Sequence, residues 1–152
     1  MRYIFSITFL LFSLISIAQS NYPYQEIGLE KAADFKTAEP FASLAANYLL
    51  TTPFKEKDPE RESAFTFLIK WTAGNRDYDF SLQGIIREMM EDRNLMQLFI
   101  PSMVKFCLEN KALGMNSRLI ETSAVKSVLD YCNNPANNFP LRKKTRKRLE
   151  AN

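Results

Sequence analysis

Histidine is absent from this 152-residue sequence, and cysteine occurs only as Cys107 and Cys132. Without histidine the chain cannot form a Ser-His-Asp triad or a Cys-His nucleophile pair, and it lacks the usual side chain for proton transfer near neutral pH. Two cysteines cannot supply the four ligands of a Cys/His zinc site. We therefore expect a non-catalytic protein with no metal site and no cofactor.

The alternation of apolar and polar residues that marks a half-buried strand is also missing, and no repeat of solenoid length is present. Apolar residues instead recur at helical spacing in residues 41–49, 59–74, 82–90, 94–111 and 117–133. The fourth segment is apolar nearly all round, which is typical of a central helix, and its proline either kinks it or begins it afresh. The pattern predicts an all-α fold, a single compact bundle or orthogonal array of about five helices.

Residues that commonly begin and end helices mark the boundaries of these segments. Asp58 and Ser81 are predicted N-caps, and Gly74 stands where a helix often ends in a left-handed glycine. Trp71 lies on the apolar face of its helix, where its indole N–H needs a partner that a nearby loop oxygen could supply. The face of the first helix that we expect to be buried consists of Phe41, Leu44, Ala45, Tyr48 and Leu49.

The N-terminus reads as a secretory signal peptide over residues 1–18. Arg2 is followed by an apolar run to Ile17, and Ser16 and Ala18 are the small residues at positions −3 and −1 of a cut after Ala18. The run is about sixteen residues, short of the roughly 20 that span a bilayer. We expect cleavage near Ala18 and export to the periplasm or beyond, with an uncleaved anchor as the alternative.

The rest of the chain divides by composition into a lead, residues 19–39, a helical domain, residues 40–134, and a basic tail, residues 135–152. The lead is expected to be loosely ordered, with a short helical turn around residues 29–35. Residues 19–141 contain thirteen Lys and Arg against sixteen Asp and Glu, a balance of −3. The tail holds six cations: Arg142, Lys143, Lys144, Arg146, Lys147 and Arg148. A short helix with a weak apolar edge is possible in this tail.

The segment Asn75–Ser81 alternates oxygen-bearing side chains like the start of a calcium loop. The sixth and twelfth positions of that loop pattern require glycine and a carboxylate, and here they hold phenylalanine and isoleucine. We therefore interpret the segment as a helix end and an anchored turn, with a ligand site as the alternative. In this interpretation Asp77 and Asp79 make turn and cap bonds, while Tyr78 and Phe80 hold the loop against the core.

Export would permit a disulfide between Cys107 and Cys132, but helix geometry argues against it. If the last two long helices form an antiparallel hairpin, the two cysteines lie about 16 Å apart along the axis. A disulfide requires Cα atoms roughly 4.4–6.8 Å apart. Buried free thiols are the favoured interpretation, and the disulfide stays open.

Three stretches, Y-L-L-T-T-P-F at 48–54, F-L-I-K-W-T-A-G-N-R-D-Y-D-F at 67–80 and Y-C-N-N-P-A-N-N at 131–138, carry a resemblance. They resemble small exported proteins of unknown function from bacteria of the Bacteroidetes group. The resemblance covers about residues 40–149 and implies an exported helical domain without a known activity.

These observations predict an exported helical binding protein of the cell envelope. Its candidate interaction surface comprises Asn75, Arg76, Asp77, Tyr78, Asp79 and the six basic residues of the tail. The expected partner is an envelope protein or an anionic lipid surface, and nucleic acid is unlikely because no aromatic residues interleave with the tail's cations. The alternatives are a cell-wall hydrolase, with Asp77 or Asp79 facing Glu88 across a groove, and a purely structural envelope protein.

Overall fold

The computed structural model describes residue 24 and residues 26–151, so the predicted signal peptide lies outside the described residues. No strand occurs in this part of the chain, and the predicted all-α fold is confirmed. The α-helices are α1 (Ala32–Thr37), α2 (Glu39–Thr51), α3 (Pro59–Gly74), α4 (Gly84–Glu88), α5 (Arg93–Glu109), α6 (Ser117–Asn133) and α7 (Lys143–Glu150). Two short 3-10 helices, η1 (Lys111–Leu113) and η2 (Pro135–Asn137), flank α6.

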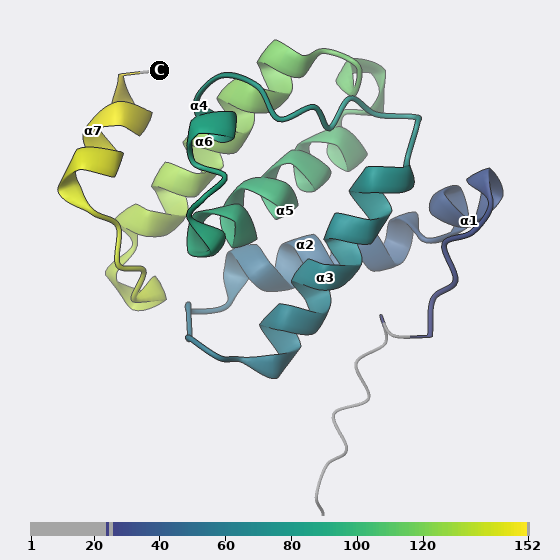
Figure 1. Ribbon diagram of the computed structural model, residues 1–152, viewed down its shortest axis with the longest axis horizontal. Helices are drawn as coiled ribbons and strands as arrows, with labels where there is room; N and C mark the ends of the chain where they lie inside the picture. Colours follow the sequence, from purple (N-terminus) through teal and green to yellow (C-terminus); the bar gives the residue numbers. More distant parts are fainter. Residues whose placement is uncertain (1–23, 25, 152) are drawn as a thin grey trace, which may run out of the picture.

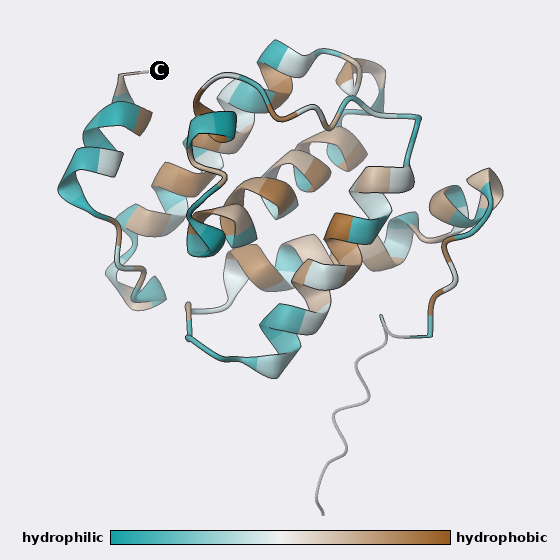
Figure 2. Ribbon diagram, in the orientation of Figure 1, coloured by the Kyte–Doolittle hydropathy of each residue, from teal (hydrophilic) through white to brown (hydrophobic). Residues whose placement is uncertain are grey.

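Helix α5 lies at the centre of the molecule and packs against α2, α3 and α6 (Figure 1). Its side chains are buried on nearly every side, as its all-round apolar sequence predicts. The helix runs through Pro101 as one element. Figure 2 shows the hydrophobic residues of α5 enclosed by the surrounding helices, whereas α7 at the edge is mostly hydrophilic.

The buried face of α2 differs from the one that its sequence predicts. Phe41 and Leu44 lie outside it, with 36% and 58% of their surface exposed. The buried residues of α2 are Ala42, Ala45, Ala46 and Leu49. Small side chains let α2 approach α3 and α5 closely, and larger ones at these positions would hold the helices apart. The prediction is therefore right for Ala45 and Leu49 and wrong for Phe41 and Leu44.

Helix α3 begins as predicted and ends differently. Asp58 caps it by accepting hydrogen bonds from the backbone N–H groups of Glu60 and Arg61. Gly74 is the last helical residue, and the cap that follows it has an extended backbone, so the predicted left-handed glycine is wrong. A Cβ at Gly74 would lie 2.5 Å from Cε1 of Phe35, and close packing of that ring is the physical reason for the glycine.

The predicted N-cap Ser81 would begin a helix at residue 82, but α4 begins two residues later, at Gly84. Its N-cap residue makes no side-chain cap bond, and Gly84, the first helical residue, has φ +49°. The N–H of Ile85 is bound instead by the carboxylate of Glu121 on α6, at 2.8 Å. The capping group comes from another helix, and local sequence could not identify it.

The segment after α6 folds back onto the domain. The side chain of Asn137 is buried and donates to the Tyr131 carbonyl at 2.9 Å, and its own carbonyl accepts the N–H of Phe54 at 2.8 Å. Helix α7 then packs on α6 through Leu149, which is 1% exposed. The basic segment is therefore a helix in a defined position.

Candidate functional site

The loop between α3 and α4 is anchored by an aromatic cluster. Trp71 is fully buried, and its Nε1–H donates to the Phe35 carbonyl of α1 at 2.8 Å. The Trp71 ring lies 6.1 Å from the ring of Tyr78 and 5.5 Å from that of Phe80, measured between centroids. This arrangement confirms that Tyr78 and Phe80 hold the loop against the core.

Tyr78 is also fixed by a polar network, and it is 7% exposed. Its hydroxyl donates to Glu39 at 2.9 Å, and Lys111 forms an ion pair with the same carboxylate. Burial alone would raise the pKa of Glu39, but the hydrogen bonds from Lys111 and Tyr78 outweigh it and lower that pKa. Burial and the Glu39 contact raise the pKa of Tyr78. Tyr78 therefore braces the loop from inside the protein.

The remaining loop residues make turn bonds. The Asn75 side chain, 4% exposed, accepts the N–H of Asp77 at 2.8 Å. Asp79 accepts the N–H of Ser81 at 3.0 Å, and its own N–H donates to the Gly114 carbonyl at 2.7 Å. Asp77 contributes its backbone and not its carboxylate, so the predicted turn bond is right for Asp79 alone, and neither aspartate caps a helix. Within residues 26–151, no group of three or more acidic or cysteine side chains is placed to hold a metal.

Helix α7 presents most of its cations to solvent. Arg146 is half-buried and donates to the Asn133 side chain, and Arg148 forms an ion pair with Glu88 on α4. In the part of the chain that the structure describes, none of the remaining four cations of this segment lies within ion-pair distance of a carboxylate. These four exposed residues are Arg142, Lys143, Lys144 and Lys147.

The structure does not bring the predicted loop and tail residues together into one surface. The loop docks beside Gly114, just before α6 begins, whereas α7 contacts the other end of α6 at Asn133. Helix α6 has 17 residues and therefore separates the two by about 25 Å. Figure 1 shows the loop after α3 and helix α7 on opposite sides of the molecule.

The carboxylates of the hydrolase alternative are likewise apart. Glu88 pairs with Arg148 and lines a cleft of about 650 Å³ between the start of α5 and the segment that leads into α7. Neither Asp77 nor Asp79 lines this cleft. The facing pair that a carboxylate-dependent hydrolase requires is not formed by these residues.

Cys107 and Cys132 are free and buried. Burial raises the pKa of each thiol to about 12. At neutral pH both thiols are protonated, and a protonated thiol is a poor nucleophile. The geometric argument against the disulfide agrees with this arrangement, and neither cysteine has the character of a reactive residue.

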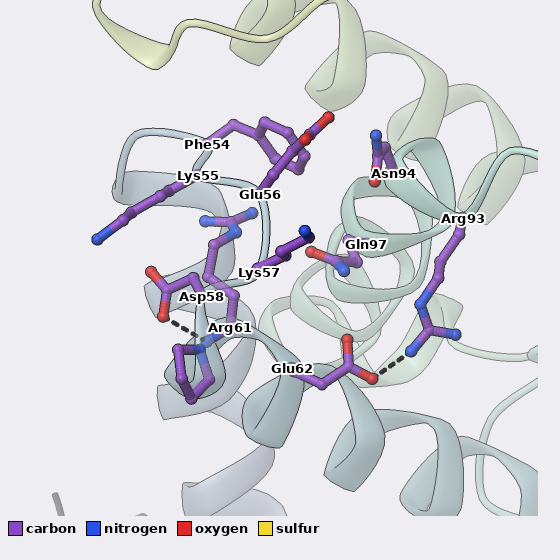
Figure 3. Close-up of a pocket in the computed structure, with 11 residues that line it drawn as sticks. Phe54, Lys55, Glu56, Lys57, Asp58, Arg61, Glu62, Arg93, Asn94 and Gln97 are labelled. Carbon is purple, nitrogen blue, oxygen red and sulfur yellow. Dashed lines mark hydrogen bonds and ion pairs between the residues drawn. The ribbon is translucent and has the colours of Figure 1, made fainter.

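A cleft that the sequence did not indicate lies between the α2–α3 loop and the first turns of α3 and α5 (Figure 3). Its volume is about 410 Å³. We call it the 54–58 cleft, and its lining residues are Phe54, Lys55, Glu56, Lys57, Asp58, Pro59, Arg61, Glu62, Arg93, Asn94 and Gln97.

Arg61 lies beneath this cleft and is 1% exposed. Its guanidinium donates to the Leu49 carbonyl at 3.1 Å and to the carbonyl and hydroxyl of Thr52 at 3.4 and 3.0 Å. These carbonyls belong to the C-terminal end of α2, whose dipole favours a cation. The guanidinium also lies over the Phe54 ring, 5.5 Å from its centroid. Within the described residues Arg61 has no carboxylate partner, and its buried Nε has no hydrogen-bond acceptor.

A trace of this arrangement is present in the sequence. Arg61 precedes Ala64, Leu68 and Trp71 by three, seven and ten residues, so it falls on the apolar face of α3. A charge on a buried face indicates either a special partner or a site.

Among the described residues, no helix is both long enough and apolar enough to cross a membrane. Comparison with known protein families, with curated proteins and with solved structures found no match for this chain. The resemblance to exported bacterial proteins therefore stays a prediction from the sequence.

Proposed function

We propose that this chain is an exported, non-catalytic binding protein that uses α7 to contact an acidic protein surface. One observation carries the proposal: α7 is fixed to α6 through the buried Leu149 while its lysines face solvent. A basic helix held in place loses little conformational freedom on binding, which favours a defined contact over diffuse attraction.

The same geometry favours a protein partner over a lipid bilayer. A helix that lies in a membrane interface inserts an apolar face between the lipids. The apolar residue of α7, Leu149, is occupied by the helix's own domain, and Leu141 just before the helix is half-buried. What remains exposed is cationic, so the contact is electrostatic and is weakened by salt.

Export is the part of the proposal that depends on sequence alone. Arg2, the apolar run and the small residues before position 19 have the composition of a secretory signal. Such a location would place α7 among the proteins and anionic surfaces of the cell envelope.

The loop Asn75–Ser81 has a different place in this proposal. Its aromatic residues and turn bonds are used within the fold, so we assign it a bracing role and leave binding to α7. Charge substitutions at Arg76 or Asp77 should then leave partner binding unchanged.

The proposal is tested with the mature chain, residues 19–152, as bait in an extract of the native envelope. The variant carries Lys143→Gln, Lys144→Gln and Lys147→Gln, which remove charge and keep Leu149 in place. We expect one stoichiometric protein on the unmodified chain at low salt, its release by salt, and its loss with the triple variant.

A matched control replaces three exposed lysines elsewhere, Lys31, Lys36 and Lys70, by glutamine. This control has the same net charge as the α7 variant and should retain the partner. If both triple variants lose the partner equally, only net charge matters and the assignment to α7 is wrong. If the chain captures no protein but binds vesicles of anionic lipid, α7 contacts a membrane surface and not a protein.

A further inference from the structure

We propose that the 54–58 cleft is a binding site for a carboxylate presented on a peptide. This inference rests on the cleft's own residues and not on α7 or the proposed function.

The cleft has an excess of positive charge once internal pairs are removed. Asp58 is occupied as the cap of α3, and Glu62 is occupied by its ion pair with Arg93. Among the charged lining residues the Glu62–Arg93 pair cancels, which leaves three cations, Lys55, Lys57 and Arg61, against two carboxylates, Glu56 and Asp58. A group of one negative charge is therefore favoured there.

Arg61 supplies part of this charge from beneath the cleft. A guanidinium has five N–H donors, and the three hydrogen bonds to α2 leave two without an acceptor, one of them on the buried Nε. Because Nε is covered, Arg61 acts through its field and not by a direct bond to the ligand. A buried charge without a counterion attracts an anion more strongly than an exposed charge does.

Two side chains provide direct contacts. The side chain of Gln97 is 8% exposed, and its amide lines the cleft, is not among the fully buried polar groups and forms no hydrogen bond within the described residues. Lys57 has φ +56°, a left-handed conformation that a lysine adopts at a cost. Figure 3 shows the ammonium of Lys57 on the side of Gln97 that carries the amide oxygen, and no bond joins them. An acceptor in the cleft could bind the ammonium and, with the amide rotated, the N–H of Gln97.

The chemistry of the cleft selects a carboxylate over a phosphate. Phosphates are commonly bound by free N–H groups at helix N-termini. Here Asp58 and Asp92 already cap α3 and α5, so they occupy those N–H groups and repel a doubly charged ligand. The amides of Gln97 and Asn94 can pair with a peptide group beside the carboxylate. A volume of about 410 Å³ is suitable for a short peptide segment.

The carboxylate could belong to a peptide C-terminus or to an acidic side chain, and three probes distinguish these sources. The probes are Ac-Gly-Gly-Ala with a free C-terminal carboxylate, Ac-Gly-Glu-Gly-amide, and the neutral Ac-Gly-Gly-Ala-amide. Each is titrated into ¹⁵N-labelled residues 19–152 at low salt and followed by NMR. We expect one of the two anionic probes to shift the backbone signals of Lys57, Arg93 and Gln97, with a Kd of about 1 mM. The neutral probe should leave these signals unchanged.

Lys57→Asn separates binding from folding. Asparagine tolerates the left-handed backbone at this position, so the variant should be at least as stable as the unmodified chain. It should bind the anionic probe about fivefold more weakly, the effect of losing one ammonium contact. Lys57→Arg should restore most of the affinity, and Lys70→Gln, on the outer surface of α3, should have no effect.

The proposal is overturned if the anionic probes shift only α7, if Lys57→Asn binds them as tightly as the unmodified chain, or if inorganic phosphate binds the cleft equally well. The α7 triple variant of the preceding section should bind the probes normally. If no envelope partner is captured but the anionic probes still bind, only the proposed function of α7 is refuted. If a partner is captured but the probes do not bind, only the cleft proposal is refuted.

Discussion

Gly84 provides the sharpest test of how this fold is held together. It begins α4 at φ +49°, and a Cβ placed there would lie 2.7 Å from Cδ of Glu121. The Glu121 carboxylate accepts the N–H of Ile85, the bond that closes the N-terminus of α4. Gly84→Ala therefore forces a side chain into the left-handed region and displaces the capping carboxylate at once.

Three effects determine the size of the loss. A left-handed conformation costs a non-glycine residue roughly 1–2 kcal/mol, and losing a helix cap costs about 1 kcal/mol. Alanine offsets roughly 0.4–1 kcal/mol by restricting the unfolded chain. The first two effects outweigh the third, so Gly84→Ala should lower the free energy of unfolding by about 2 kcal/mol.

Urea denaturation of residues 19–152 measures this change. Gly28→Ala is the matched control, because no atom lies within 4 Å of a Cβ at Gly28. It should change stability by no more than about 0.5 kcal/mol. Glu121→Ala alone should cost about 1 kcal/mol, and the double variant should cost less than the sum of the two singles, since the cap is lost only once. Equal effects of Gly84→Ala and Gly28→Ala, or strict additivity in the double variant, would refute the reasoning.

Three further predictions follow from buried groups. The pKa of the thiols of Cys107 and Cys132 rises on folding from 9.0 to about 12, so stability is complete below pH 9 and falls as pH rises toward 12. Urea denaturation at pH 7 and pH 10.5 should show this loss, and a double alanine variant should reduce it. Trp71→Phe removes the bond to the Phe35 carbonyl and should lower the free energy of unfolding by about 2 kcal/mol, with faster proteolysis around α1. Leu149→Ala should cost about 2–4 kcal/mol and expose the backbone amides of α7 to hydrogen exchange.

The helices themselves could be predicted because each leaves a local pattern in the sequence. The period of apolar residues located the four longest helices, α2, α3, α5 and α6, together with the short α4, and the all-round apolar run identified α5 as central. Asp58 was a reliable boundary because a helix N-cap bonds to N–H groups only two and three residues away. Patterns of this kind depend on neighbours in the chain, which a sequence displays directly.

The errors arose where the partner of a residue lies far away in the sequence. Gly74 and Gly84 are required by Phe35 and Glu121, which belong to other helices. The exposed position of Phe41 depends on how closely the alanines of α2 approach α3 and α5, and helical spacing alone does not contain that distance.

The candidate site was the least predictable feature. The 54–58 cleft combines a loop with the first turns of α3 and α5, so its residues come together only in the folded chain. The predicted loop residues have the chemistry of a site, but the side-chain oxygen of Asn75 and the hydroxyl of Tyr78 form their hydrogen bonds within the fold. Exposed polarity in a sequence does not reveal which groups have partners inside the protein.

The difference between polar groups with a partner inside the protein and those without one favours the 54–58 cleft as the binding site. Several polar groups of this fold form hydrogen bonds with a different helix. Arg61 binds the end of α2, Glu121 binds the start of α4, and the carbonyl of Phe35 binds Trp71. The amide of Gln97 differs from these groups, because it faces the 54–58 cleft beside the strained Lys57 and forms no hydrogen bond within the described residues. This is the position at which we propose the ligand. A carboxylate between these two side chains would complete, from outside the chain, the kind of bonding that the rest of the fold completes from within.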